Sequence, residues 1–230
     1  MSKFLVISPH PDDLDFGCAG TIAKLVQDGH TVEELIISDG SKGSPIVGFG
    51  GKKLAQIRKT EERECAKLLG VRKVHFLGEV DGEVENTKAL RKKIVKVIRT
   101  IRPDIVLSFD PSSLHFESVY RSHRDHRQVG EAVFDALYPA AGNSSFFPEL
   151  LRQGVVPHKV KEVWFFAEPK PNKYVNITGT IDMKIKGLLC HKSQIRDHKM
   201  IESMLKDRAR QAGKKRNMKY AETFRVMKLD

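Results

Sequence analysis

The chain has 230 residues, of which 40% are hydrophobic and 30% charged, so it is long enough for one large α/β domain or two small ones, and disorder is excluded as a description of the whole. The 40 Lys and Arg residues exceed the 29 Asp and Glu residues, for a net charge of +11; this suits either an acidic partner or a basic solvated surface. No apolar run approaches the roughly 18 to 20 residues of a membrane span.

Apolar, β-branched runs predict strands that alternate with amphipathic helices. The predicted strands are 3–8, 31–38, 73–77, 105–109, 160–167 and 174–177, and the predicted helices are 17–29, 53–70, 87–102, 123–138 and 181–191. Alternation of this kind produces a mainly parallel sheet with helices on both faces. We therefore predict a Rossmann-like, three-layer α/β sandwich, with the site at the carboxyl-terminal edge of the strands.

Three long stretches show no regular pattern, and they cover 39–51, 110–122 and 140–159. Connections of this length are often functional loops. Roughly the last 25 residues are basic and weakly periodic, which predicts an arm or an oligomer contact at the end of a single domain spanning 1–230. We expect a homo-oligomer in which Phe146 and Phe147 pack between subunits.

The cysteine pattern and the amino-terminal segment both bear on the cellular compartment. Cys18, Cys65 and Cys190 are odd in number, far apart and without a C-x-x-C pair, which argues against a disulfide framework and a cysteine-type zinc module. Residues 1–8 lack the apolar core of a signal peptide. A cytoplasmic protein is the expectation.

The first predicted strand leads into the sequence P-H-P-D-D at residues 9–13. Asp12 and Asp13 repel each other unless a positive charge lies close, and a divalent cation supplies one. Successive side chains of an extended segment point apart, so one aspartate can bind a metal while the other faces a water molecule. An aspartate at a helix entrance is also a common N-cap. These residues alone leave a metal site and a cap equally open.

A second cluster follows the fourth predicted strand, where His123 and His126 stand three residues apart. On a helix the two share one face, and the topology brings them to the same sheet edge as His10. Together the two clusters offer imidazole and carboxylate ligands. Three such ligands with an open position are typical of a catalytic zinc site, although other divalent metals accept the same ligand types.

These motifs resemble those of the LmbE-like (PIG-L) family of metal-dependent de-N-acetylases. The string P-H-P-D-D-x-D-x-G-x-x-G-T-I at residues 9–22 is similar to the family's first motif. The later similarities are, in order, Arg58-Lys59-Thr60-Glu61 with Leu69-Gly70-Val71, Phe76-Leu77-Gly78 with Asp81-Gly82, Pro103-Asp104-Ile105-Val106, His123-x-Asp125-His126-x-x-Val129-Gly130, and Lys184 with Leu188-Leu189-Cys190-His191-Lys192-Ser193-Gln194. Their order along residues 4–195 makes the resemblance specific.

The resemblance implies a Zn²⁺ cofactor bound by His10, Asp13 and His126. It implies Asp12 as the general base, and His123 as the group that stabilises the oxyanion or acts as an acid. Asp125 is expected to orient His123 and to raise the pKa of that ring, which would keep it charged.

Two positions depart from the family pattern. Leu14 stands where some members carry an acidic residue directly after the two aspartates, and Asp15 is expected to take over that supporting role behind the ligands. Arg124 replaces the proline of the family's H-P-D-H motif and is expected to bring a positive charge near the site.

Two further candidates for substrate binding each have an equally good structural interpretation. Arg58 suits a sugar hydroxyl or a phosphate, but an ion pair with Glu61 or Glu62 on the same helix explains it as well. His191 suits the pocket edge, but a helix cap or a satisfied buried histidine explains it as well.

The resemblance implies a hydrolase that removes the acetyl group from an N-acetylglucosamine-type substrate and releases acetate and a free amine. The alternatives are a metal-dependent amide hydrolase with a non-sugar substrate, and a basic α/β protein that binds nucleotide or nucleic acid. A binding protein does not need the base Asp12, and aromatic residues for stacking are scarce at 7%. The expected partner is a small N-acetylated amino sugar, with no specific nucleic acid.

Overall fold

The structure is a computed structural model, and it describes residues 1–44, 46, 48–112 and 119–229. Its strands are β1 (Lys3–Ser8), β2 (Thr31–Ser38), β3 (Lys73–Glu79), β4 (Ile105–Phe109), β5 (Glu162–Phe166), β6 (Lys173–Asn176) and β7 (Ala221–Lys228). They form one sheet in the order β3-β2-β1-β4-β5-β7-β6. The strands from β3 to β5 pair in parallel, and β7 is antiparallel to both of its neighbours.

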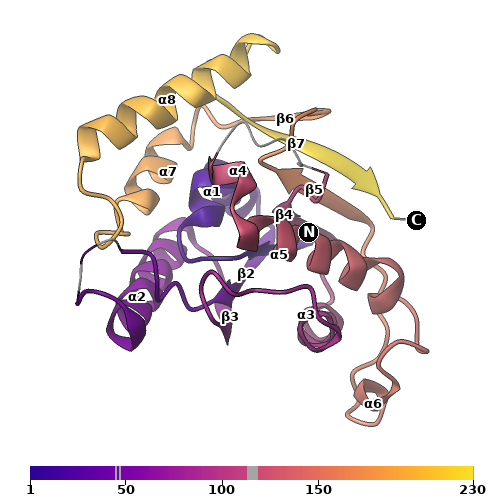
Figure 1. Cartoon of the computed structure of the whole chain (residues 1–230). Coiled ribbons are helices and arrows are strands. Elements are labelled where there is room, and N and C mark those ends of the chain that lie inside the picture. The colour runs from indigo at the N-terminus through magenta and orange to yellow at the C-terminus, as the bar shows by residue number, and fades with distance from the viewer. Residues whose placement is uncertain (45, 47, 113–118, 230) are drawn as a thin grey trace.

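The helices cover both faces of this sheet (Figure 1). They are α1 (Asp13–Gln27), α2 (Gly51–Leu69), α3 (Lys88–Ile101), α4 (Val119–Ser122), α5 (Arg124–Asp135), the π-helical turn η1 (Ala136–Ala141), α6 (Pro148–Leu151), α7 (Ile181–Leu188) and α8 (His198–Lys214). Successive strand residues point to opposite faces: Leu5 and Ile7 belong to the core with α3 and α5, whereas Phe4 and Val6 belong to the core with α1 and α2. The predicted three-layer α/β fold is confirmed.

Helix α1 begins at Asp13, earlier than the predicted start at Gly17. Asp12 adopts a left-handed conformation with φ 94°, and its carbonyl oxygen accepts the N–H of Asp15 at 3.0 Å. The chain can therefore turn directly from β1 into the helix. A kink at Cys18, where φ is −149°, separates this first turn from the stretch that shows regular helical spacing in the sequence.

Roughly the last 25 residues do not form the predicted basic arm; they complete the fold as the end of α8 and as β7. Ile201, Leu205 and Ala209 recur every four residues along α8, and this apolar stripe packs in a core shared with α7. Strand β7 pairs with β5 and β6 and buries Phe224. The basic residues of this segment therefore belong to α8 and β7, which are integral parts of the fold.

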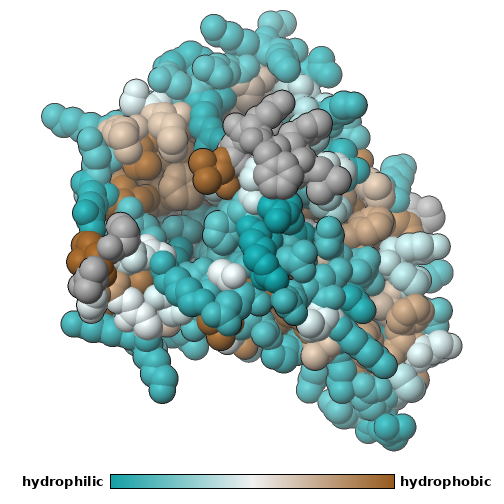
Figure 2. Space-filling view, viewed as in Figure 1, coloured by the Kyte–Doolittle hydropathy of each residue, from teal (hydrophilic) through white to brown (hydrophobic). Residues whose placement is uncertain are grey.

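The carboxyl-terminal ends of the parallel strands carry the segments that the motifs occupy. Strand β1 leads into residues 9–13, and its neighbour β4 leads, through a connection, into α5 and its first turn. The middle of the face seen in Figure 1 is mainly hydrophilic (Figure 2). Among the described residues, no helix is both long and apolar enough to cross a bilayer.

Candidate active site

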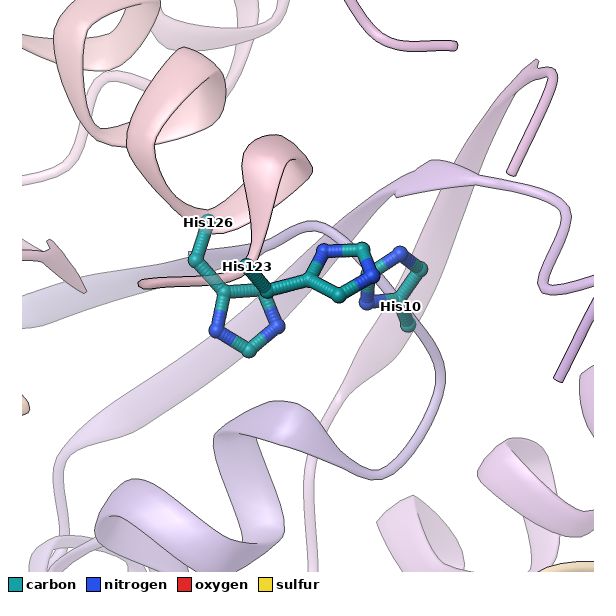
Figure 3. Close-up of side chains that lie close together, drawn as sticks. All are labelled: His10, His123 and His126. Carbon is teal, nitrogen blue, oxygen red and sulfur yellow. The ribbon is translucent and has the colours of Figure 1, made fainter. Parts of the chain in front are cut away.

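The two motifs meet at one point, as the topology predicts. The loop after β1 contributes His10, and the first turn of α5 and the residue before it contribute His126 and His123 (Figure 3). Each ring offers a nitrogen, and these three atoms lie within 4.8 Å of one another. His10 and His126 are buried, whereas His123 is exposed.

Asp13 lies between two of these imidazoles. Its Oδ2 is 2.8 Å from Nδ1 of His10 and 3.2 Å from Nε2 of His126. Burial alone raises the pKa of Asp13, but the two neighbouring histidines outweigh burial and lower it, so the carboxylate is ionised. Among the described residues, Nδ1 of His126 is buried without a hydrogen-bond partner. Two imidazoles around one ionised carboxylate fit the ligand preferences of Zn²⁺ and related divalent ions.

The opposite side of His10 faces two carboxylates. Its Nε2 lies 3.0 Å from Oδ2 of Asp125 and 3.1 Å from Oδ1 of Asp81. Burial lowers the pKa of His10, but Asp13, Asp125 and Asp81 together raise it well above the usual value. Carboxylates in this position orient a metal-binding imidazole. The sequence pattern indicates no role for Asp81, although the Asp-Gly turn after the third strand marks its position.

The expected pairing of Asp125 with His123 is wrong. The Asp125 carboxylate turns toward His10 and the connection between β3 and α3, where it accepts the backbone N–H groups of Gly82 at 2.7 Å and Val84 at 3.3 Å. Those partners lie more than 40 residues away in sequence, so the spacing within the His-x-Asp-His motif contains no information about them.

His123 is consequently neutral rather than charged. Burial, together with the nearby charges of His10 and His126, lowers the pKa of His123, and the Asp125 and Asp13 charges do not compensate. Nδ1 of His123 accepts the backbone N–H of Asp125 at 3.2 Å. A neutral ring whose Nδ1 is an acceptor carries its proton on Nε2. His123 can therefore act as a neutral hydrogen-bond donor.

Asp12 and Arg58 form a buried ion pair beside the histidines, with Nη2 of Arg58 3.1 Å from Oδ1 of Asp12. The same guanidinium donates to the carbonyl oxygens of Pro11 at 2.6 Å and Gly40 at 3.2 Å. Burial raises the pKa of Asp12, and the Arg58 charge lowers it only in part, so the pKa remains above that of a free aspartate. Arg58 therefore contacts the proposed base and its loop.

Glu61 and Glu62, which the sequence offers as ion-pair partners of Arg58, are engaged elsewhere. Glu61 accepts the backbone N–H and the hydroxyl of Ser193 at 2.8 and 2.6 Å. Glu62 accepts the backbone N–H of Asp12 at 3.0 Å. Arg124 also turns away from the three histidines, because its guanidinium bonds to Glu85 and to the carbonyl oxygen of Val84.

Asp15 does not support the three ligands. It lies two residues after Asp13, about 200° around the helix, and faces α2 and α7 instead. There it bonds to Nε2 of His191 at 2.8 Å and to the Cys65 thiol at 3.1 Å. His191 is 0% exposed, so it matches the buried histidine alternative and not a residue at the pocket edge. Burial lowers the pKa of His191, but Asp15 and Glu62 raise it to about 9.

Comparisons with known proteins agree with this geometry. Residues 5–137 match the family described as PIG-L: GlcNAc-PI de-N-acetylase. The chain is 37% identical over 229 residues to diacetylchitobiose deacetylase of Thermococcus kodakarensis, covering 99% of this chain and 84% of the relative. It is 26% identical over 208 residues to a probable N-acetyl-α-D-glucosaminyl L-malate deacetylase of Bacillus cereus, covering 88% and 86% of the two chains.

A solved structure of N,N'-diacetylchitobiose deacetylase from Pyrococcus horikoshii, in complex with an inhibitor, superimposes with a TM-score of 0.91 at 34% identity. The match covers 98% of this chain and 84% of that one. Deacetylases of this family depend on a metal ion. The chain therefore belongs to the PIG-L family, and it is a metal-dependent deacetylase.

Proposed function

We propose that this protein is a zinc-dependent hydrolase that removes the acetyl group from an N-acetylglucosamine-type sugar, with diacetylchitobiose as the substrate of first choice. The observation that carries the proposal is the Asp13 carboxylate held between His10 and His126, with the buried carboxylate of Asp12 next to it in the chain. The substrate rests on the Thermococcus relative, which matches almost the whole chain.

The metal ligands in this proposal are His10, Asp13 and His126. When bound there, Zn²⁺ would polarise the acetamide carbonyl and make a water molecule more acidic. Asp81 and Asp125 keep the His10 ring turned so that its Nδ1 faces Asp13. The same donor types also bind other divalent ions, and two imidazoles with one carboxylate form a ligand set that catalytic zinc sites use.

Asp12 is the general base. Its pKa, raised by burial, makes it more basic than a free aspartate, while Arg58 keeps it ionised and oriented. Asp12 takes the proton from the attacking water molecule and passes it to the amine nitrogen as the amide bond breaks. Both transfers use one carboxylate, so the protons balance without a second acid.

His123 stabilises the oxyanion that forms when water adds to the carbonyl carbon. A neutral imidazole with its proton on Nε2 can donate to this oxygen without carrying a charge of its own. The exposed position of His123 at the amino-terminal end of α5 leaves that nitrogen accessible to a substrate.

The direct test replaces Asp12 with Asn, which keeps the size of the side chain and removes its basicity. We expect Asp12→Asn to bind metal like the parent protein and to lose turnover by roughly 10²- to 10⁴-fold. Free amine released from diacetylchitobiose measures turnover, and elemental analysis measures the metal content. Unchanged activity in this variant would remove Asp12 from the role of base.

We further propose that the protein forms homo-oligomers in the cytoplasm. The exposed side chains of Tyr138, Phe146 and Val156, which follow α5, support self-association, whereas Phe147 is buried in the core and does not. Free cysteines at three positions support a reducing compartment. Sedimentation velocity of the parent and of Phe146→Ser should give a larger species for the parent, and a monomeric parent would contradict the first proposal.

A further inference from the structure

Asp12 holds a backbone conformation that its side chain does not favour. Its φ of 94° lies in the left-handed region, which residues other than glycine adopt only at a cost in free energy. Such a conformation persists only when the surrounding structure imposes it. For the residue proposed as the general base, this strain has a direct consequence, because φ and ψ set the direction in which the carboxylate leaves the chain.

Two side chains of helix α2 bind Asp12 and the peptide groups around it. Arg58 binds the Asp12 carboxylate and the preceding carbonyl oxygen of Pro11. Glu62, one helical turn later on the same face, accepts the backbone N–H of Asp12 at 3.0 Å through Oε2. The first contact orients the side chain, and the second holds the peptide group that the left-handed conformation would otherwise leave buried without an acceptor.

Glu62 sits in an environment that does not suit a carboxyl group. It is 1% exposed, its Oε1 has no hydrogen-bond partner among the described residues, and Nε2 of His191 is 3.8 Å from its Oε2. Burial and the Asp15 carboxylate raise the pKa of Glu62 to about 8. An apolar side chain of the same size would avoid this cost. The carboxyl group adds the hydrogen bond to Asp12 here, beside its contacts with His191 and with the equally buried Glu34.

We infer that Glu62 is a positioning residue for the reaction, whose acceptor oxygen holds the backbone of the base Asp12 in its left-handed conformation. This inference rests on the proposed function, because it requires Asp12 to act as the base. The positioning effect depends on the length of the Glu62 side chain and on its acceptor oxygen rather than on its charge. A neutral carboxyl group or an amide oxygen accepts the same N–H.

Two substitutions separate these properties. Glu62→Gln keeps the length and the acceptor oxygen and removes the ionisable carboxyl group, whereas Glu62→Asp keeps the carboxyl group and withdraws the acceptor by one methylene. We expect Glu62→Gln to retain at least about a third of the parental kcat, and Glu62→Asp to lose about 10- to 100-fold in kcat, as misplaced catalytic groups do. KM for diacetylchitobiose should stay within about twofold in both, because uniform binding is unaffected.

Metal content and the midpoint of thermal unfolding are measured for the parent and for both variants alongside the kinetics. Full metal occupancy in Glu62→Asp supports positioning of the base, whereas loss of metal, an active Glu62→Asp, or an inactive Glu62→Gln would overturn the inference. If Glu62→Asp does not fold, amide hydrogen exchange of the parent resolved at Asp12 decides: slow exchange supports the hydrogen bond to Glu62, and fast exchange refutes it. A parent protein that releases no amine from any sugar tested would instead refute the proposed function.

Discussion

At the scale of single residues, His10 shows how the site is assembled, because its two ring nitrogens meet different partners. Nδ1 faces Asp13, and Nε2 faces Asp125 and Asp81. The imidazole thus stands between a proposed ligand and two carboxylates that orient it, which is the usual arrangement around a protein-bound metal ion. Asp125 therefore acts on a different histidine from the one that its motif suggested.

His126 provides a residue-scale prediction about the metal. The His126→Ala variant should lose nearly all bound metal and with it the deacetylase activity, because Asp13 and His10 alone form an incomplete ligand set. Elemental analysis of the purified protein measures the metal-to-protein ratio. His198→Ala, an exposed histidine at the start of α8, is the matched control and should keep both metal and activity. A fully loaded His126→Ala protein would rule out the ligand assignment.

At the scale of elements, buried polar contacts join helix α1 to α2, to α7 and to the residues that follow α7. Asp15 of α1 bonds to His191, which follows α7, and to Cys65 of α2. Lys184 of α7 pairs with Glu222 of β7 at 2.5 Å, and Glu222 also accepts the N–H groups of Gly20 and Thr21 in α1. Breaking a buried pair of this kind is costly, since the remaining charge is left uncompensated. Helix α1, which carries Asp13, is thereby linked to α2, to β7 and to the residue that follows Leu189 and Cys190 after α7.

The His191 contact makes stability depend on pH. The folded-state pKa of about 9 lies above the ordinary value of 6.5, so its contribution is complete below pH 6.5 and is lost as pH rises through 9. We expect the free energy of unfolding to fall by about 3 kcal/mol over this window. Chemical denaturation at several pH values measures it. His191→Gln should show a flatter profile, and an identical slope in both proteins would contradict the argument.

At the scale of the whole molecule, an ion bound only to the folded state links activity to stability. Removing the metal with a chelator should abolish amine release and lower the midpoint of thermal unfolding by roughly 5–10 °C, if the ion was present at about a hundred times its Kd. Added Zn²⁺ should restore both. The metal-free His126→Ala variant should not respond to the chelator, and an equal shift in that variant would show that the chelator acts elsewhere.

The net charge of +11 is also a property of the whole surface. The structure spreads basic residues over α3 and α8, where several pair with nearby acids, as Lys92 does with Glu149 and Lys206 does with Glu202. These exposed pairs contribute little to stability. Because these basic residues are dispersed and paired with acids, they favour the interpretation of a basic solvated surface and not that of a dedicated polyanion site.

Much of the fold could be predicted because its signals are local. The β-branched runs predict β1, β2 and β4 with their observed ends, and Gly70, with φ 80°, ends α2 where the sequence indicates. Strand β7 could not be predicted, because its pattern is weak and its place between β5 and β6 depends on partners far away in the chain. A strand whose pairing is long-range has little local signal.

The sequence by itself determined which chemical groups reach the site, because P-H-P-D-D and His-x-Asp-His follow strands whose ends must meet at one sheet edge. Only the tertiary structure decided how those groups are paired: Asp125 with His10, Asp15 with His191, and Glu62 with the backbone of Asp12. The physical reason is that each pairing joins segments 50 or more residues apart. The direction of a buried side chain follows from the packing around it, which local spacing does not record.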